Sequence, residues 1–445
     1  MNRPRIVLLG LGVLILAATV GIARLGDLGE RARTMLVFWG VAHAAYLAAV
    51  GCVLRPGGAE RSTLWIILGV GLLGRLVLVP TAPTLSEDVY RYVWDGNLVA
   101  HGVNPFPHAP SDPALERFRG DLLRHLNHTD VPTIYPPAAQ LLFGAAALVS
   151  ATPVAWKLLL LALEFGLVLA LLRLLKSRGL ANDRLLLYYW NPLVLVESFG
   201  SGHVDLAAAA FLVTALALHE TGQRARAGIA FGLAVLTKYV PGLLIPWLVR
   251  RRAWVMLLAA AVTAALLTAP FIAAGPALTT GLRIYARHWE FNGALYGLLR
   301  HGIASDLAVR LILAFACVAS SLLVAWKARS ATGAALASLG AFLLLSPTVF
   351  PWYVVPVVAL LPLHPDWGML AFSGLLALSY LPLPGYRETG VWTLPGWIVG
   401  VEYGGLLAVW AAAAFTRRKS GAGVGVDERQ HAHVEKSEKV EEEKR

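Results

Sequence analysis

The sequence SEDVYRYVWDG, residues 86–96, begins a polar stretch that runs from Thr84 to Pro137 in an otherwise apolar chain. The middle of this stretch reads GVNPF, residues 102–106, and its tail reads TIYPP, residues 133–137. Apolar runs long enough to cross a bilayer, about 20 residues each, precede and follow it. A stretch rich in acids, aromatic residues and histidine that directly follows a membrane span predicts a functional site.

The composition predicts an integral membrane protein. Hydrophobic residues make up 57% of the 445 residues and charged residues only 15%, whereas soluble proteins carry about 25% charged residues. The apolar runs have the length of spanning helices, and they lack the alternation over about ten residues that a membrane barrel needs. The predicted fold class is therefore an all-α polytopic bundle of about 12–14 hydrophobic segments.

The expected spans, in chain order, are residues 6–23, 35–54, 63–80, 135–150, 155–175, 184–199, 204–219, 227–249, 253–274, 306–326, 332–346, 352–363, 367–382 and 396–416. The first is expected to be an uncleaved helix rather than a signal peptide, because further spans follow at once. The run 227–249 contains Pro241 and Pro246. It is predicted to be a hairpin of two short helices that meet near Lys238.

The distribution of lysine and arginine sets the expected orientation. The net charge is +11, but the basic residues gather at the ends of apolar runs, as topology determinants do, so no nucleic-acid partner is expected. The positive-inside rule places six basic clusters in the cytoplasm: Arg3 and Arg5, Arg55 and Arg61, Arg224 and Arg226, Arg250–Arg252, Lys327 and Arg329, and Arg417–Lys419. The opposite face then receives residues 81–134, 200–205, 275–305, 347–353 and 383–395.

One basic loop does not fit this orientation. Lys176, Arg178 and Arg184 also favour the cytoplasm, yet two apolar runs separate them from the first external loop. Either the run 135–150 is a re-entrant or shallow helix that does not cross the membrane, or the basic loop is external. The sequence alone leaves both interpretations open.

The chain is expected to divide into one membrane domain, residues 1–416, and a tail, residues 417–445. The tail is rich in glycine and then in mixed charge, which predicts a disordered cytoplasmic segment. The two cysteines, Cys52 and Cys317, lie inside apolar runs. They predict neither a disulfide framework nor a metal site.

The residues after Ser86 have the pattern of an amphipathic helix. Asp88, Arg91, Tyr92 and Asp95 fall on one side at helical spacing, which predicts a helix that lies on the membrane surface. The adjacent carboxylates of Glu87 and Asp88 repel each other and raise a pKa, so that one of them could serve as a general base or bind a cation. The alternative is that Ser86 or Asp88 only caps this helix.

Further motifs carry a resemblance to a known family. Residues 87–96, together with 102–106 and 134–140, resemble the first external loop of GT-C glycosyltransferases, and most closely that of bacterial polyprenol-phosphate-mannose-dependent mannosyltransferases and the related family 87 enzymes. The resemblance covers most of residues 60–360. Its downstream matches are GHVD at 202–205 after NP at 191–192, KYVP at 238–241, WEFNG at 289–293 and SPTVFPWY at 346–353.

The resemblance implies a membrane hexosyltransferase, with mannose as the expected sugar. Such an enzyme takes the sugar from a polyprenyl phosphate at the external face of a bacterial-type inner membrane and passes it to an acceptor hydroxyl, with inversion. The expected partners are the polyprenyl-phosphate sugar, membrane lipid and a glycan or lipid-linked acceptor.

The resemblance also implies roles for individual residues. The acid at the start of the first loop, Asp88, is expected to be the general base, with Glu87 and Asp95 as alternatives. The departing phosphate needs cations, and an isolated lysine in an apolar hairpin, Lys238, is a functional candidate by default, although it could instead extend to the surface. The residues assigned to donor or phosphate binding are Arg91, His203, Asp205 and Lys238. Those assigned to sugar or acceptor binding are Tyr92, Asp95, Asn104, Tyr135, Trp289, Asn292 and Trp352.

No cofactor is predicted. Asp88, Asp95, Asp205 and His203 are residue types that ligate divalent cations, but no spacing between them requires a metal. The aromatic candidates have a plain alternative as anchors at the membrane interface.

A transporter or flippase is the alternative function. Such a protein should place its charges near the bilayer midplane on facing helices, whereas here the charges gather at the outer ends of spans and in long external loops. This distribution favours an enzyme. The enzyme hypothesis further predicts that Asp88, His203 and Lys238 converge on one external cavity.

Overall fold

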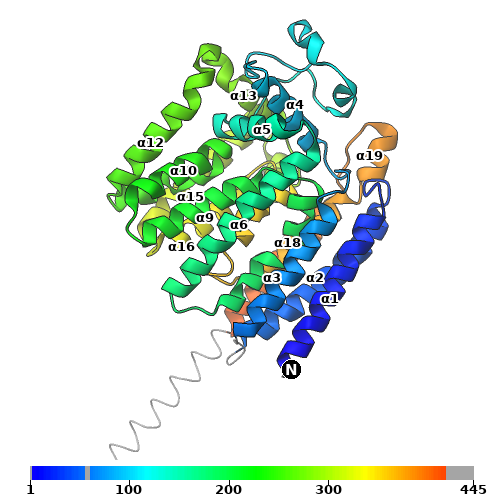
Figure 1. Cartoon of the computed structure of the whole chain (residues 1–445), viewed down its shortest axis with the longest axis vertical. Helices are drawn as coiled ribbons and strands as arrows, with labels where there is room; N and C mark the ends of the chain where they lie inside the picture. The colour runs from blue at the N-terminus through cyan, green and yellow to red at the C-terminus, as the bar shows by residue number, and fades with distance from the viewer. Residues whose placement is uncertain (1–2, 56–60, 417–445) are drawn as a thin grey trace, which may run out of the picture.

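The computed structural model describes residues 3–55 and 61–416 and confirms the all-α polytopic fold (Figure 1). By length and composition, seven helices in the described residues can cross a membrane. They become eight if the bent pair Pro192–Gly200 and Asp205–Glu220, which meet at 118°, forms one span. The expected tail, residues 417–445, lies outside the described residues.

The elements follow the predicted spans with some breaks. The α-helices are α1 (Arg3–Arg24), α2 (Ala32–Leu54), α3 (Arg61–Leu78), α4 (Asp88–Ala100), α5 (Pro137–Val149), α6 (Pro153–Ser177), α7 (Leu186–Tyr189), α8 (Pro192–Leu195), α9 (Asp205–Glu220), α10 (Arg224–Thr237), α11 (Ile245–Arg250), α12 (Trp254–Thr268), α13 (Thr280–His288), α14 (Ala294–Gly302), α15 (Asp306–Lys327), α16 (Ala331–Leu345), α17 (Val355–Val358), α18 (Trp367–Leu375), α19 (Leu383–Thr389) and the helix Gly396–Thr416.

Short turns join them. The 3₁₀ turns are η1 (Pro113–Phe118), η2 (Asp121–His125), η3 (Asn182–Leu185), η5 (Val240–Leu244), η6 (Ala269–Thr279), η7 (Pro351–Val354) and η8 (Leu376–Tyr380), and η4 (Val196–Gly200) is a π-helical turn. Among the described residues no strand forms. An isolated bridge joins Phe291 and Asn292 to Thr348.

Polar caps start several of the helices in the apolar chain. Thr152 accepts a hydrogen bond from the Ala155 amide before α6, and Pro153 occupies the first turn of that helix. Ser305 and Ser330 accept in the same way before α15 and α16. Each side chain satisfies a backbone donor that the first helical turn leaves unpaired. These caps explain where the spans begin.

Proline breaks two of the predicted spans. The run 184–199 forms η3, α7, α8 and η4, with Pro192 at the start of α8. The run 352–363 forms η7 and α17, which contain Pro351 and Pro356. Proline lacks a backbone donor and clashes with the preceding turn, so it ends a helix. The run 227–249 breaks at Lys238 into α10, η5 and α11, as predicted.

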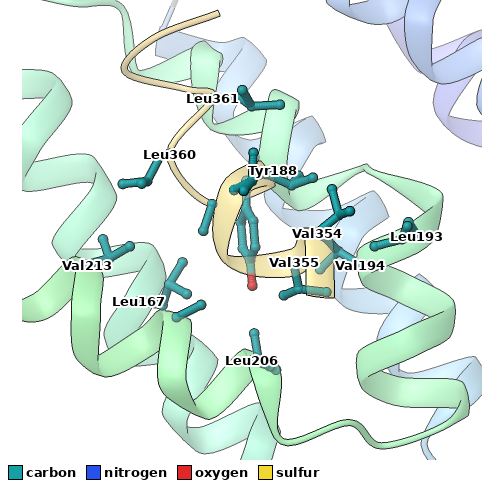
Figure 2. Packing of buried hydrophobic residues seen from close by; sticks show 14 of the residues in the cluster. Leu167, Tyr188, Leu193, Val194, Leu206, Val213, Val354, Val355, Leu360 and Leu361 are labelled. Carbon is teal, nitrogen blue, oxygen red and sulfur yellow. The ribbon is translucent and has the colours of Figure 1, made fainter. Parts of the chain in front are cut away.

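These broken segments form the centre of the apolar core. Figure 2 shows Tyr188 of α7 surrounded by Leu167 of α6, Leu206 of α9, and Val354 and Val355. Irregular backbone at membrane depth is tolerated only where protein encloses it. The core therefore holds the ends of these segments in place, and the candidate site lies on them.

The loops gather at two opposite ends of the helices. At the loop end, which carries α4, α13 and α19 (Figure 1), residues far apart in the sequence are in contact. Asn104 donates to the Phe271 carbonyl at 3.2 Å, and the rings of His128 and Trp289 lie 4.6 Å apart. Arg387 pairs with Asp27 at 2.5 Å. The predicted external segments thus share one end of the bundle.

The opposite, basic end settles the position of the loop at Arg178. Arg178 pairs with Glu220, and its guanidinium also donates to the Thr332 hydroxyl at 2.6 Å. Arg251 donates to the Ala328 carbonyl at 3.0 Å in the loop before α16, whose first turn contains Thr332. The run 135–150 is therefore the shallow helix of the two interpretations. Its helix α5 packs along α4 at the loop end. Between residues 137 and 177, only α6 is long enough to run from the loop end to the basic end.

The helix α4 is more enclosed than a helix lying on a membrane surface. Arg91, Tyr92, Trp94 and Asp95 are all buried. A Cβ atom at Gly96 would lie 2.4 Å from the Phe143 carbonyl oxygen, so glycine is required where α4 meets α5. This close approach fixes the direction in which α4 presents its first residues.

A buried ion pair joins α3 to α6. The guanidinium of Arg75 donates to both carboxylate oxygens of Glu164, one of them at 2.6 Å, and to the carbonyls of Gly71 and Tyr189. Tyr188 donates to Glu164 at 2.6 Å. The guanidinium nitrogens and both carboxylate oxygens thus have hydrogen-bond partners, which a stable buried ion pair requires.

We expect the variant Glu164→Gln to lower the free energy of unfolding by on the order of 3–5 kcal/mol, because it leaves the Arg75 charge buried without a counter-ion. Thermal unfolding of the protein in detergent measures the loss. The double variant Arg75→Met, Glu164→Gln carries neither charge and should recover most of the stability. A single variant that is as stable as the double one would contradict this interpretation.

Candidate active site

The candidate site lies at the loop end, where the first residues of α4 and α9 meet the end of α10 and the segment 346–354. Asp88 is the first residue of α4, and the hydroxyl of Ser86 accepts a hydrogen bond from its backbone amide at 3.2 Å. The Asp88 side chain itself does not cap the helix. It is 29% exposed and thus reachable from outside.

The surroundings of Asp88 change its acidity. Burial against the neighbouring side chains raises the pKa of the Asp88 carboxyl to about 6, against the effect of the Lys238 ammonium, which lowers it. The carboxylates of Asp205 and Glu87 add to the rise, and a hydrogen bond from Tyr135 opposes it. A carboxyl with a pKa near neutrality is suited to accept and release a proton.

His203 lies next to Asp88 on the turn between η4 and α9. Gly202, at φ +81°, makes the turn, and its carbonyl accepts from the Trp156 indole at 2.6 Å. The His203 ring is buried and stacks on Trp352, with centroids 3.6 Å apart and planes at 10°. Its Nδ1 lies 3.9 Å from the Asp88 carboxylate. The turn and the stacking together fix the imidazole against the candidate base.

Lys238 and Asp205 form the charged pair of the site. Lys238 directly follows the last residue of α10, and its ammonium donates to the Asp205 carboxylate at 2.5 Å. The same ammonium lies 3.6 Å from the centre of the Tyr353 ring. Asp205 is buried at the start of α9, where the helix dipole favours an acid. The Lys238 side chain stays 20% exposed, so a ligand can reach it.

Aromatic rings extend from this pair toward the loops. The hydroxyls of Tyr353 and Tyr285 lie 2.5 Å apart, and Trp352 stacks on Phe350 at 4.5 Å. Trp289 tilts against Tyr285 with ring centroids 5.4 Å apart. Flat apolar faces beside charged groups are typical of sites that bind a ligand with both polar and apolar surfaces.

Of the other predicted residues, Tyr92 and Tyr135 lie beside Asp88. Their rings meet edge to face at 4.9 Å, and Tyr92 stacks on Phe143 of α5 at 4.7 Å. Tyr92 is buried and Tyr135 is partly exposed. Tyr135 thus offers a partly exposed ring beside Asp88, whereas the Tyr92 ring packs behind it.

Arg91 and Asp95 are paired with each other away from this centre. The guanidinium of Arg91 donates to Asp95 at 2.9 Å and to the Val131 carbonyl at 3.0 Å, and Gln140 donates to Asp95 at 3.1 Å. These bonds fasten the end of the first loop to α4. The side chains of Arg91 and Asp95 therefore hold the first loop in place.

Asn104 and Asn292 also hold loops. Asn104 accepts from the Phe106 amide at 3.1 Å in addition to its bond with the Phe271 carbonyl. Asn292, at φ +53°, donates to the buried carboxylate of Glu402 at 2.6 Å. Glu87 precedes α4 and is exposed beside the site.

The structure adds residues that the sequence analysis did not select. Glu197 of η4 is fully buried, with a carboxylate oxygen 3.4 Å from the His203 Nε2. Tyr353 and Tyr285 complete the side of the site that faces Lys238. A glutamate within an apolar run is itself a signal of function, so Glu197 could have been found from the sequence.

The five charged or titratable residues Asp88, Glu197, His203, Asp205 and Lys238 are called here the charged cluster. The cluster offers a partly exposed carboxylate, a partly exposed ammonium and a stacked imidazole. The described residues contain no group of three or more His, Cys, Asp and Glu placed to hold a metal ion. The arrangement can take a proton from a hydroxyl and bind an anion nearby.

Residues 20–254 match the MptA_B family, described as alpha-(1->6)-mannopyranosyltransferase, N-terminal domain. The match covers more than half of the chain. The chain belongs to this family. As a member of the MptA_B family it is a multi-pass membrane mannosyltransferase, which requires a sugar donor and a glycan acceptor. The comparison with curated proteins finds no match.

The whole charged cluster lies within the part that matches the MptA_B family. The aromatic residues Trp352 and Tyr353, which contact His203 and Lys238, lie beyond it. The matched part therefore supplies the acids and bases of the site, and the rest of the chain supplies the rings that cover them.

Proposed function

We propose that this mannosyltransferase moves mannose from a polyprenyl-phosphate mannose to a hydroxyl of a mannose-containing glycan, in an α-1,6 linkage and with inversion at C1. Asp88 is the general base. The observation that carries the proposal is the position of the Asp88 carboxylate beside His203 and the Lys238–Asp205 pair, at the end of the bundle where the loops gather. The α-1,6 linkage follows the description of the family.

Asp88 is the carboxylate of the charged cluster that a substrate can reach. Asp205 is buried and neutralised by Lys238, and Glu197 is fully buried. In the proposed step the acceptor oxygen attacks C1 of mannose while its proton passes to Asp88. The bond between C1 and the phosphate oxygen breaks, and its electron pair leaves with polyprenyl phosphate. One base and one leaving group are sufficient for a single displacement that inverts C1.

Lys238 is the proposed partner of the leaving phosphate. Negative charge grows on the phosphate oxygens as the C1–O bond breaks, and a fixed cation stabilises it. The ammonium of Lys238 is partly exposed and held by Asp205 and the Tyr353 ring. The positively charged developing ring of mannose can lie against the Asp88 carboxylate, and the aromatic residues can pack on its faces.

The site is proposed to face the outside of a bacterial-type inner membrane. The basic residues Arg178 and Arg251 at the opposite end support a cytoplasmic position for that end under the positive-inside rule. A polyprenyl phosphate keeps its chain in the membrane and its phosphate at the interface. The loop end places Lys238 and Asp88 at the end of the helices, where such a head group would lie.

A donor comparison tests the proposal. Purified protein in lipid vesicles is supplied with labelled polyprenyl-phosphate mannose or with labelled nucleoside-diphosphate mannose, each with a mannoside oligosaccharide as acceptor. We expect labelled product from the lipid donor alone. Product from the nucleotide donor alone would contradict the proposed donor, and uptake of unmodified solute without product would favour the transporter hypothesis.

The acidity of Asp88 predicts the pH dependence of transfer. The base works only when ionised, and its pKa is raised to about 6. We therefore expect kcat/KM to rise about tenfold for each pH unit below 6 and to level off above it. Initial rates at donor concentrations well below KM, between pH 4.5 and 8, measure this limb. A rate that is constant or falls between pH 5 and 7 would contradict Asp88 as the base.

A further inference from the structure

Glu197 is a fully buried carboxylate at the level of the site. It lies in the π-helical turn η4, and such turns often occur at functional sites. Tyr380 donates to one of its carboxylate oxygens at 2.7 Å. The other oxygen has no hydrogen-bond partner in the described part of the chain. This free oxygen faces His203.

The two carboxylates Asp88 and Glu197 lie on opposite edges of the His203 ring. Nε2 is 3.4 Å from Glu197, and Nδ1 is 3.9 Å from Asp88. Within the described residues neither ring nitrogen has a hydrogen-bond partner, although only 1% of the His203 side chain is exposed. The His203 amide donates to the Glu197 carbonyl at 2.9 Å, which fixes the two residues together. Hydrogen bonds of catalytic groups are often long before substrate binds and shorten in the complex.

We propose that Glu197 is a positioning residue that acts through His203 on the catalytic base Asp88. This inference rests on the proposed function, because it assumes that Asp88 takes a proton from the acceptor. The carboxyl oxygen of Glu197 that Tyr380 leaves free accepts a hydrogen bond from Nε2–H of His203. The imidazole is thereby held in the tautomer that leaves the Nδ1 lone pair facing Asp88.

This tautomer favours the protonated form of Asp88. When the acceptor hydroxyl gives its proton to Asp88, the new carboxylic acid donates a hydrogen bond to Nδ1, while Nε2 remains bonded to Glu197. No proton is created or lost, since the proton leaves the acceptor oxygen and stays on Asp88 until product departs. A group that stabilises the protonated base makes it a stronger base. The arrangement uses the general logic by which a third residue orients a histidine.

Other titratable groups also face this line of residues. Lys238, Asp205, Glu87 and Tyr135 act on Asp88 from α10, α9 and the first loop. Tyr380 and Asp205 act on Glu197, and Lys238 acts on His203. These groups stay in place in variants of Glu197. The double variant with His203→Gln separates an effect that passes through the imidazole from a direct effect of the Glu197 charge on Asp88.

The variant Glu197→Gln tests the proposal. An amide oxygen can still accept from Tyr380, but the amide nitrogen then faces Nε2 and donates to it. His203 must carry its proton on Nδ1, which favours the ionised form of Asp88. We expect the acidic limb of the kcat/KM profile to move down by about one pH unit, a tenfold change in proton affinity, and kcat to fall while KM for the donor stays within about threefold.

Controls separate this role from structural damage. Glu402→Gln changes another buried glutamate that holds a loop through Asn292, and we expect it to leave the position of the limb unchanged. His203→Gln should move the limb in the same direction as Glu197→Gln, and the double variant should move it no further, because both act through one chain.

An acidic limb that stays in place in a folded Glu197→Gln protein would overturn the proposal. If that protein does not fold in detergent, His203→Gln decides, and an unmoved limb there overturns it equally. A wild-type protein without transferase activity on the lipid donor would instead overturn the proposed function. If wild type is active but the acidic limb stays in place in both variants, only the role of Glu197 is overturned.

Discussion

The variant Asp88→Asn is expected to lose mannosyl transfer by about 10²- to 10⁴-fold in kcat, the usual contribution of a positioned general base. Asparagine has the size of aspartate but cannot take a proton from the acceptor hydroxyl. The side chain is partly exposed, and its carboxylate does not cap α4, so folding should be preserved. Initial rates with labelled polyprenyl-phosphate mannose measure the loss.

A matched control and a binding measurement complete this prediction. Asp121→Asn makes the same change on the first loop, where the side chain is 95% exposed, and should transfer mannose at the wild-type rate. Donor affinity of Asp88→Asn should remain within a few-fold of wild type, because the base acts in the transition state. If Asp88→Asn retains more than a tenth of the wild-type kcat, Asp88 is not the general base, and Glu87 or Asp95 becomes the candidate.

The variant Lys238→Met is expected to lose both stability and activity. It leaves the buried carboxylate of Asp205 without its counter-ion, which costs on the order of 3–5 kcal/mol in the free energy of unfolding. It also removes the cation beside the departing phosphate, and the loss of one such group lowers kcat by about 10²- to 10³-fold. Unfolding in detergent and transfer rates measure the two effects separately.

A second substitution separates stability from catalysis. The double variant Lys238→Met, Asp205→Asn contains no unpaired charge and should recover most of the lost stability. Its transfer rate should stay as low as that of Lys238→Met, since no cation returns. Recovery of the rate together with the stability would show that Lys238 serves the fold alone.

Much of this architecture could be predicted from the sequence, because hydrophobicity decides membrane insertion. Seven of the 14 expected apolar runs correspond to helices long enough to cross a membrane, and the basic clusters mark two distinct ends. Asp88, His203 and Lys238 approach one another in the charged cluster, as predicted, whereas the external cavity on which they were expected to converge stays a prediction. The break at Lys238 was visible in the prolines that follow it.

Other features depend on tertiary packing and could not be read from local patterns. The pattern of α4 suggested a surface helix, but the missing side chain at Gly96 lets α5 cover it. The resemblance implies binding roles for Arg91 and Asp95, yet the Val131 carbonyl and Gln140 complete a buried network around them. Glu197 stands out in the sequence as a glutamate within an apolar run, but its contact with His203 depends on the turn at Gly202.

The measurement that tests the central claim most directly is the fate of C1 of mannose in a single reaction. Wild-type protein and Asp88→Asn are each given polyprenyl-phosphate mannose labelled at C1 and a mannoside acceptor, and the product and the released polyprenyl phosphate are quantified. The proposal predicts equal amounts of both in wild type, an anomeric configuration opposite to that of the donor, and almost no product from Asp88→Asn. A retained configuration, or wild-type yield from Asp88→Asn, would contradict single displacement with Asp88 as the base.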